Sequence, residues 1–196
     1  LLYDAGPRYS LESDAGHRVL VPLLKALDTR LDRVVLSHRD TDHVGGAAAV
    51  LAMQPLADLW SSLEAAHPLL AMRSGQRCEA GQRWEWDGVQ FAVLHPRAED
   101  YTGSARPNAL SCVLRISNGR QTALLVGDIE QAQEARLVVD ATILKADLLL
   151  IPHHGSRTSS SGAFLDAVQP QHAWVQSGYR NRFGHPVPSV LERYRE

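Results

Sequence analysis

The most constraining feature of the sequence is a group of metal-binding side-chain types directly after an apolar run. Arg33–Leu36 reads R-V-V-L, which is typical of a short buried strand, and S-H-R-D-T-D-H-V-G-G follows it over residues 37–46. Four imidazole and carboxylate groups this close together repel one another or stay unpaired unless a divalent cation lies among them. Gly45 and Gly46 allow the backbone to bend and pack closely where the next helix begins. The segment therefore predicts a strand, a ligand loop and a helix in close succession.

The four groups of this segment are of the types that bind metals. A chain that leaves a strand and turns into a helix can direct all of them at one point, and imidazole with carboxylate suits zinc, manganese or iron. The alternative is a polar loop in which one aspartate caps the helix and the histidines are solvated. One cap accounts for one aspartate only, so metal binding is the preferred interpretation. The residues are His38, Asp40, Asp42 and His43.

Two later strand ends carry the same chemistry. The apolar run over residues 124–126 is followed by G-D, and the run over residues 148–151 is followed by P-H-H-G-S. One acid or histidine after a strand is usually an ordinary loop residue. Three such strand ends favour a shared site, because strands of parallel or mixed sheets gather functional residues at their carboxyl ends. The additional ligand candidates are Asp128, His153 and His154.

Composition indicates an ordinary soluble globular domain. The 196 residues are enough for one sizeable core, with 44% hydrophobic and 21% charged residues. The net charge of −2 excludes a global basic field, which lowers the expectation of a simple DNA-binding module. No apolar run approaches the roughly 20 residues of a membrane-spanning helix, and no signal peptide opens the sequence. Cys78 and Cys112 form no metal-binding pair; we expect a free buried thiol at Cys112, with a disulfide as the alternative.

Short β-rich runs alternate with helical stretches, which predicts a mixed α/β fold with central sheets and outer helices. The opening letters L-L-Y-D-A-G resemble the end of a strand, so we expect a fragment of a longer protein. Asn118-Gly119 is a hairpin turn signal. Strands are expected at residues 1–3, 33–36, 89–94, 111–116, 123–126, 148–151 and 173–176, and helices near 19–27, 44–53, 130–139, 163–168 and 189–194.

The motifs, in their order along the chain, resemble those of the metallo-β-lactamase fold superfamily. The usual second motif of that superfamily is H-x-H-x-D-H, and this chain has Asp40 in place of the second histidine. Together with N-x-x-S, G-D-I-E and a late G-H-P, this substitution resembles the C-terminal domain of the ComEC-type competence proteins. The resemblance extends from Asp4 to His185, and its main motifs are Asp4-x-Gly6, His38-x-Asp40-x-Asp42-His43, Gly127-Asp128 and His153-His154-Gly155-Ser156.

The resemblance implies an αββα four-layer sandwich that forms a single domain over residues 1–196 of a larger membrane protein, with the first strands of the fold missing. It also implies a centre of two divalent metal ions, with Asp4 orienting the ligands from behind. Manganese is favoured by the many carboxylates, and zinc is the close competitor. One ion would be held by His38 and Asp40, the other by Asp42, His43 and His154, with Asp128 bridging them.

The middle motif of the superfamily usually supplies a histidine. This chain has Asn108 and Ser111 there, so one ion would have fewer protein ligands and more water. His95 lies nearby in sequence, and we expect it to be structural. Trp84, Trp86 and Trp174 are expected mainly in core packing, with base stacking as the alternative.

The site so implied suits hydrolysis of a phosphodiester, because two ions about 4 Å apart activate water and stabilise both oxygens of an in-line displacement. Asp42 or Asp128 would orient the nucleophile. His153 or His185 would protonate the leaving oxygen, and His153 is open to ligand, proton-donor or phosphate-contact roles. Phosphate contacts are expected from Ser156, Arg157, Arg180 and Arg182, with simple surface solubility as the alternative.

For the ComEC-type branch, the resemblance implies a nuclease that degrades one strand of incoming DNA while the other strand enters the channel of the parent membrane protein. It places the domain on the extracytoplasmic side, with DNA as substrate, no stable soluble partner, and a monomeric domain. Two alternatives stay open. One is hydrolysis of another ester on the same fold, as in a phosphorylcholine esterase, lactonase or thioesterase, which needs a closed pocket. The other is a catalytically inactive scaffold domain of a DNA channel.

Overall fold

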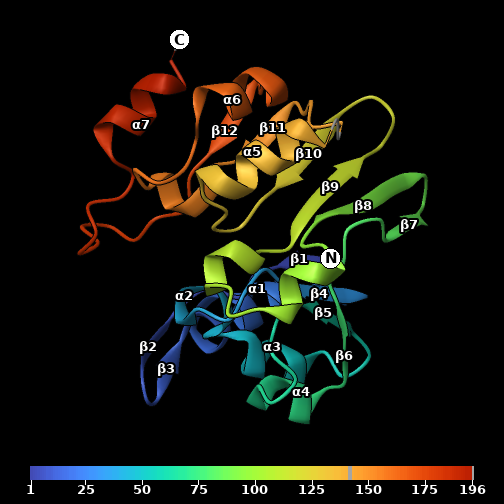
Figure 1. Cartoon of the computed structure of the whole chain (residues 1–196). Helices are drawn as coiled ribbons and strands as arrows, with labels where there is room; N and C mark the ends of the chain where they lie inside the picture. The colour runs from blue at the N-terminus through green and yellow to red at the C-terminus, as the bar shows by residue number, and fades with distance from the viewer. Residues whose placement is uncertain (141–142, 196) are drawn as a thin grey trace. The chain divides into compact units, whose positions relative to one another are not determined.

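The computed structural model describes residues 1–140 and 143–195, which divide into two compact units (Figure 1). The first unit is Leu1–Cys78, and the second begins at Glu79 and continues to the end of the described chain. Each unit has its own principal sheet and its own apolar core. No helix among the described residues has the length and apolar character needed to cross a bilayer.

The sheet of the first unit consists of four parallel strands in the order β1-β4-β5-β6. Leu2 is paired with Val34 across β1 and β4, so the residues that follow these two strands leave the sheet at the same edge. A separate antiparallel ribbon is formed by β2 (Arg8–Ser10) and β3 (Ser13–Asp14). The sheet strands are β1 (Leu2–Tyr3), β4 (Arg33–Leu36), β5 (Asp58–Ser61) and β6 (Gly75–Arg77).

The helices of the first unit are short. They are the π-helical turn η1 (Gly16–Leu20), α1 (Val21–Ala26), α2 (Thr41–Val44), α3 (Ala47–Met53) and α4 (Pro68–Met72). All four residues of β4 are buried, as its β-branched sequence predicts. Its apolar side chains join those of α3 in one core, for example Val34, Leu36, Val50 and Leu51.

Gly46 stands where three backbone segments of the first unit meet. The Gly46 N–H donates to the Gly6 carbonyl at 3.2 Å, and the Ala5 N–H donates to the His43 carbonyl at 2.7 Å. A Cβ atom at Gly46 would overlap the backbone of Gly16 and the carbonyl oxygen of Ala5. The glycine pair after the ligand loop therefore holds the β1 segment, η1 and α3 in close contact, because only glycine leaves enough space.

The second unit contains a six-stranded mixed sheet in the order β12-β11-β10-β9-β8-β7. Strands β10, β11 and β12 are parallel, whereas β7 to β10 are connected antiparallel neighbours. Ala123 is paired with Leu148, so β10 and β11 end at the same edge. The strands are β7 (Arg83–Trp86), β8 (Val89–His95), β9 (Val113–Ser117), β10 (Thr122–Leu125), β11 (Leu148–Leu150) and β12 (His172–Trp174).

Three α-helices and three 3₁₀ turns complete the second unit. They are α5 (Gln131–Val139), α6 (Gly162–Val168), α7 (Pro188–Arg193), η2 (Ala98–Thr102), η3 (Pro107–Leu110) and η4 (Pro152–Gly155). Leu137 on α5 and Phe164 on α6 pack with Leu124 and Leu149 in the core of this unit. Glu130 is the N-cap of α5 and forms a capping box with Gln133.

Three expectations from sequence need correction. The helix expected at residues 44–53 begins at Ala47, because α2 and the two glycines come first. The expected free thiol at Cys112 is wrong: both Cys78 and Cys112 are disulfide-bonded, and no free cysteine is found in the described part of the chain. Trp174 is 63% exposed, so core packing does not apply to it.

Core-type packing does apply to the other two tryptophans. Trp84 stacks on Phe91 with ring centroids 4.9 Å apart and an interplanar angle of 3°. Trp86 meets Phe91 edge-on at 5.3 Å. Both tryptophans are on β7 and Phe91 is on β8, so the three rings form one cross-strand aromatic cluster.

We predict that Gly46→Ala destabilises the protein by roughly 2 kcal/mol or more, because the added methyl group forces the packed backbone segments apart. Thermal or urea unfolding measures the loss. Gly103→Ala is the matched control, since a Cβ at Gly103 meets no atom within 4 Å. Equal stability of the two variants would contradict the close-packing argument.

Candidate metal centre

The Asp4 carboxylate organises the ligand loop of the first unit. Its Oδ1 accepts a hydrogen bond from the Ser37 N–H at 2.6 Å, and its Oδ2 accepts one from the Ser37 hydroxyl at 2.8 Å. The Nδ1 of His43 lies 2.8 Å from the same Oδ2. Asp4 has a positive φ of 58° directly after β1, which directs its side chain to the neighbouring strand end of β4. The carboxylate is mostly buried, so these bonds are charge-assisted and poorly screened.

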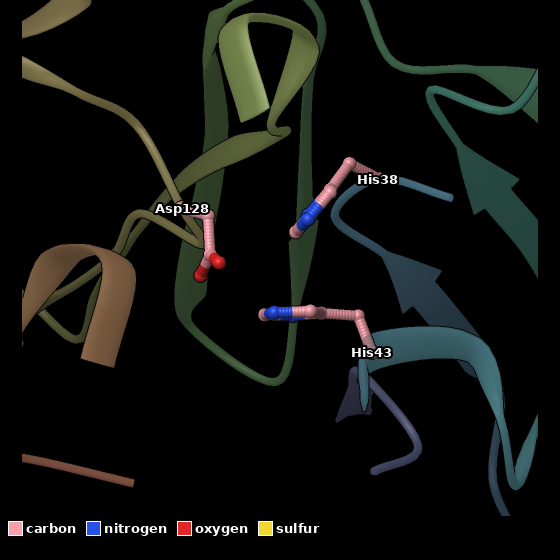
Figure 2. A group of neighbouring side chains, drawn as sticks. All are labelled: His38, His43 and Asp128. Atoms are coloured by element: carbon pink, nitrogen blue, oxygen red, sulfur yellow. The ribbon is translucent and has the colours of Figure 1, made fainter. Parts of the chain in front are cut away.

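His38 and His43 are a buried pair. Their side chains are almost inaccessible, and their ring centroids are 4.1 Å apart at an angle of 49°. In Figure 2 the two rings extend side by side, His38 from the loop after β4 and His43 from α2. The bond to Asp4 requires a proton on Nδ1 of His43, so the Nε2 atom keeps its lone pair for a cation. His38 Nδ1 lies 3.0 Å from the Ser37 hydroxyl.

The two aspartates of the loop are more accessible. Asp40 is the N-cap residue of α2, but its side chain makes no capping hydrogen bond, so the simple capping interpretation fails for it. Its Oδ2 lies instead 3.6 Å from His38 Nε2. Asp42 is exposed in the first turn of α2. These residues, His38, Asp40, Asp42 and His43, are called the first ligand cluster below.

Asp128 lies three residues beyond β10 in the second unit and is 4% exposed (Figure 2). Its N–H donates to the hydroxyl of Ser111, a fully buried residue, at 3.0 Å. That bond fixes the backbone at Asp128 and gives Ser111, the serine of the N-x-x-S motif, a positioning role. Since β10 and β11 are parallel neighbours, Asp128 and the histidines after β11 meet at one sheet edge. Asp128, His153 and His154 are called the second ligand cluster below.

The backbone of the two histidines is unusual. His153 and His154 have φ values of 49° and 54°, and Gly155 follows at 78°. Left-handed conformations cost roughly 1–3 kcal/mol for residues with a side chain, and they concentrate at functional positions. Here they are held by hydrogen bonds from the His153 N–H to the Gly127 carbonyl at 3.0 Å and from the Ser156 N–H to the His153 carbonyl at 2.8 Å. The strained turn directs both imidazoles toward Asp128.

His154 has a fixed tautomer. Its Nδ1 lies 2.7 Å from the backbone carbonyl of Gln176, which can only accept, so Nδ1 carries a proton. Its Nε2 lies 3.5 Å from Asp128 Oδ2. A proton or a cation between these two atoms makes the contact favourable. The pair has the donor set of a metal-binding position.

His153 lies between two acidic groups. Its Nε2 is 3.7 Å from Asp128 Oδ2, and its Nδ1 is 3.4 Å from Glu130 Oε1. Thr158 Oγ1 lies 3.2 Å from the same Nδ1 and donates to Glu130 at 3.1 Å, and Asn108 Nδ2 is 3.4 Å from Nε2. His153 is thus surrounded by acidic, hydroxyl and amide groups, all within 3.7 Å of its ring nitrogens. Sequence reasoning missed Glu130 as a site residue, although the G-D-I-E motif contains it.

His185 extends the second ligand cluster outward. Its ring centroid is 5.8 Å from that of His153, at 76°. Burial lowers the pKa of His185, and the neighbouring His153 and His154 lower it further. His185 is therefore neutral more readily than an ordinary histidine.

The expected phosphate-contact residues differ in exposure. Ser156 is buried, and its hydroxyl lies 3.2 Å from Thr158 Oγ1, so it supports the turn. Arg157, Arg180 and Arg182 are exposed.

Each cluster taken alone has the chemistry of a divalent-cation site. Both combine imidazole with carboxylate. In each cluster the Nδ1 atom of one histidine lies close to a protein acceptor, which is Asp4 for His43 and the Gln176 carbonyl for His154. Such acceptors are typical of metal-binding histidines, because they fix the ring and its tautomer. Mixed nitrogen and oxygen ligands suit zinc or manganese.

His95 is structural in the second unit, as its sequence context suggested. It is buried at the end of β8, and its Nε2 lies 2.8 Å from the Ala109 carbonyl. Burial lowers the pKa of His95, while this hydrogen bond and Asp100, 3.8 Å from Nδ1, oppose the shift. The neutral ring thus fixes η3, the turn that contains Asn108.

The chain has clear similarity to known proteins. The family model described as Metallo-beta-lactamase superfamily matches residues 1–178. Competence protein ComA of Neisseria gonorrhoeae is 39% identical over 100% of this chain and 26% of its own length. Recombination protein 2 of Haemophilus influenzae is 34% identical over 98% of this chain and 23% of its own length. The chain thus spans about a quarter of the length of each of these two relatives.

Among solved structures, a metallo-β-lactamase of Cronobacter sakazakii with the HARLDQ motif has a similar fold, with a TM-score of 0.53 at 18% identity. The alignment covers 78% of this chain and 66% of the other.

We predict that His95 makes the stability of the protein fall with acid. Because the folded pKa is below the unfolded value of about 6.5, its contribution is complete above that value and is lost as pH falls through the folded pKa. Below pH 6.5 the protonation of His95 lowers the free energy of unfolding by at most about 1.4 kcal/mol per pH unit. His95→Gln keeps a donor for Ala109 and cannot titrate. Urea unfolding from pH 7 to pH 5 should show a shallower decline for the variant, and parallel declines would contradict the assignment.

Proposed function

The chain belongs to the metallo-β-lactamase superfamily, and on that premise we propose that it is a two-metal phosphodiester hydrolase that cleaves DNA during uptake. The match confirms the expected fold class, the αββα sandwich of that superfamily. The observation that carries the proposal is the pair of positioned histidines, whose Nδ1 atoms lie 2.8 Å from Asp4 Oδ2 for His43 and 2.7 Å from the Gln176 carbonyl for His154. The names of two relatives, a competence protein and a recombination protein, support DNA as the substrate class.

We assign the ligands from the order of the motifs along the chain. Asp40 stands where the common superfamily motif has histidine, and this carboxylate makes the ligand set harder than that of a lactamase. Manganese is therefore favoured over zinc. One ion would be held by His38 and Asp40 and the other by Asp42, His43 and His154, with Asp128 as a ligand shared by both.

The bound ions supply Lewis-acid stabilisation and lower the pKa of a coordinated water. The chain supplies the remaining functions. Asp128, held by Ser111, orients the nucleophile. His153, held between Asp128 and Glu130, is placed to give a proton to the leaving oxygen or to contact a phosphate oxygen, and His185 is the second candidate for proton transfer.

The parent protein and its location are also proposals. The chain spans about a quarter of the competence protein and of the recombination protein named above, which supports a domain that serves the DNA channel of a larger membrane protein. Cys78 and Cys112 are disulfide-bonded, and disulfides persist mainly in oxidising compartments. This supports the extracytoplasmic side of the membrane. We propose no stable soluble partner and a monomeric domain.

The direct test is DNA cleavage by the metal-stripped domain after addition of manganese, zinc or magnesium in turn. Labelled single-stranded and double-stranded DNA are the substrates, and phosphorylcholine esters, lactones and thioesters are run alongside. We expect manganese-dependent DNA cleavage. His43→Ala should cleave DNA at least about 100-fold more slowly, because a ligand is removed.

His172→Ala is the matched control. His172 is exposed at the start of β12, whereas the histidines assigned to the site follow the end of the parallel neighbour β11. No cleavage with any metal, or equal activity of His43→Ala and the parent, would contradict the nuclease proposal. Hydrolysis of a small ester alone would favour the alternative hydrolase.

Asp4→Asn should lower metal affinity by about 10- to 100-fold, because the amide no longer accepts fully from both Ser37 and His43. Isothermal titration calorimetry with manganese and zinc measures the affinity. Asp32→Asn, at an exposed position before β4, is the control. An unchanged affinity of Asp4→Asn would contradict the orienting role of Asp4.

A further inference from the structure

We propose that the loop Gly178–His185, called the aromatic loop below, binds unpaired nucleobases and selects single-stranded DNA. The proposal rests on the proposed function and adds the strand state of its substrate. It depends on contacts within the second unit only.

The aromatic loop exposes large rings next to cations. Tyr179 is 90% exposed and Phe183 is 63% exposed. The guanidinium of Arg180 lies 5.3 Å from the Tyr179 ring centroid, and that of Arg182 lies 4.8 Å from the Phe183 ring centroid. Large apolar rings on a surface are costly to expose, and a group of them marks a binding surface.

The charged side chains of the segment that contains the loop have one sign. Between Asp166 and Glu192 the sequence contains no acidic residue, whereas Arg180 and Arg182 lie in this stretch. Alternating aromatic and basic side chains are complementary to single-stranded nucleic acid, since bases stack on the rings and phosphates pair with the guanidinium groups. The net charge of the whole chain is −2, so this basic stretch is local.

Asn181 fixes the conformation of the loop. Its Nδ2 donates to the carbonyls of Gly178 at 3.0 Å and His185 at 2.5 Å. Its Oδ1 accepts from the N–H groups of Phe183 at 3.2 Å and His185 at 3.0 Å. One side chain thus ties both ends of the loop together, with the rings and guanidinium groups outside. A preordered loop loses less conformational freedom when it binds.

The aromatic loop is connected to the second ligand cluster. The Phe183 ring stacks on His185 with centroids 5.8 Å apart and an angle of 25°, and His185 in turn lies against His153. The Val187 N–H donates to the Gly155 carbonyl at 2.9 Å, which anchors the chain after the loop to the histidine turn. A base on Phe183 therefore lies beside the residues that we assign to the scissile phosphate.

This position favours an unpaired strand. Bases of a duplex are stacked on one another and do not present a face to a protein ring, whereas each base of a single strand does. One base–aromatic stack strengthens binding by roughly 5- to 150-fold. The aromatic loop thus favours single-stranded over double-stranded DNA, whatever the base sequence.

The test measures binding by the metal-free domain, which separates it from catalysis. Fluorescence anisotropy with a labelled thymine oligonucleotide compares the parent with Phe183→Leu, Phe183→Trp and Tyr179→Leu. We expect about 10-fold weaker binding for each leucine variant and parental binding for Phe183→Trp, since leucine is apolar but has no ring face. An abasic oligonucleotide of equal length should bind the parent more weakly than the normal one binds either leucine variant, because it loses both stacks.

Charge is tested by Arg182→Ala against Arg120→Ala, an exposed arginine in the turn between β9 and β10. We expect weaker oligonucleotide binding for Arg182→Ala only. Equal binding of the abasic and normal oligonucleotides, or no effect of the leucine variants, would overturn the proposal. So would loop variants that lose binding to anionic phospholipid vesicles and keep oligonucleotide binding, which would assign the loop to a membrane surface.

The two proposals fail in different ways. Hydrolysis of bis(p-nitrophenyl) phosphate by the metal-loaded parent reports on phosphodiester chemistry without any base. If the parent hydrolyses this ester and DNA, and the leucine variants bind the oligonucleotide as the parent does, only the proposal for the aromatic loop is overturned. If the parent binds the oligonucleotide through the loop but cleaves neither the ester nor DNA, only the proposed function is overturned.

Discussion

The Asp4 carboxylate is the interaction on which the first ligand cluster depends. It accepts from the Ser37 N–H and hydroxyl and contacts His43, so one acid fixes both the start of the loop after β4 and a histidine on α2. This arrangement requires β1 and β4 to be parallel neighbours, and it requires glycine at position 46 to bring α3 against the β1 segment. The sheet, the glycine and the ligand loop are therefore parts of one local structure.

The second ligand cluster is built on the same principle with different residues. Parallel pairing of β10 and β11 brings Asp128 and the two histidines to one edge. The left-handed turn at His153 and His154 then directs their rings, and the Gln176 carbonyl after β12 fixes the tautomer of His154. In both units a neighbouring strand end supplies the acceptor that orients a histidine. Imidazoles oriented in this way meet the requirement of a preorganised metal site.

The sequence alone predicted most strands, because apolar runs bounded by polar loops are a strong signal. The His and Asp residues directly after these runs stay predicted ligands. Residues 33–36 matched β4 in full, since a β-branched buried run has few alternatives. Contacts that depend on tertiary structure were not accessible. Glu130 was read as part of the G-D-I-E motif and of a helix start, but its position near His153 comes from the fold. The disulfide state of Cys112 and the exposure of Tyr179 likewise depend on distant segments.

The measurement that tests the central claim most directly is anomalous X-ray diffraction from crystals of the domain grown with manganese. The account predicts two anomalous peaks, with ligands drawn from both clusters: His38, Asp40, Asp42 and His43 from the first, and Asp128 and His154 from the second. Peaks bound by only one cluster, or no peaks at either, would contradict the two-metal assignment.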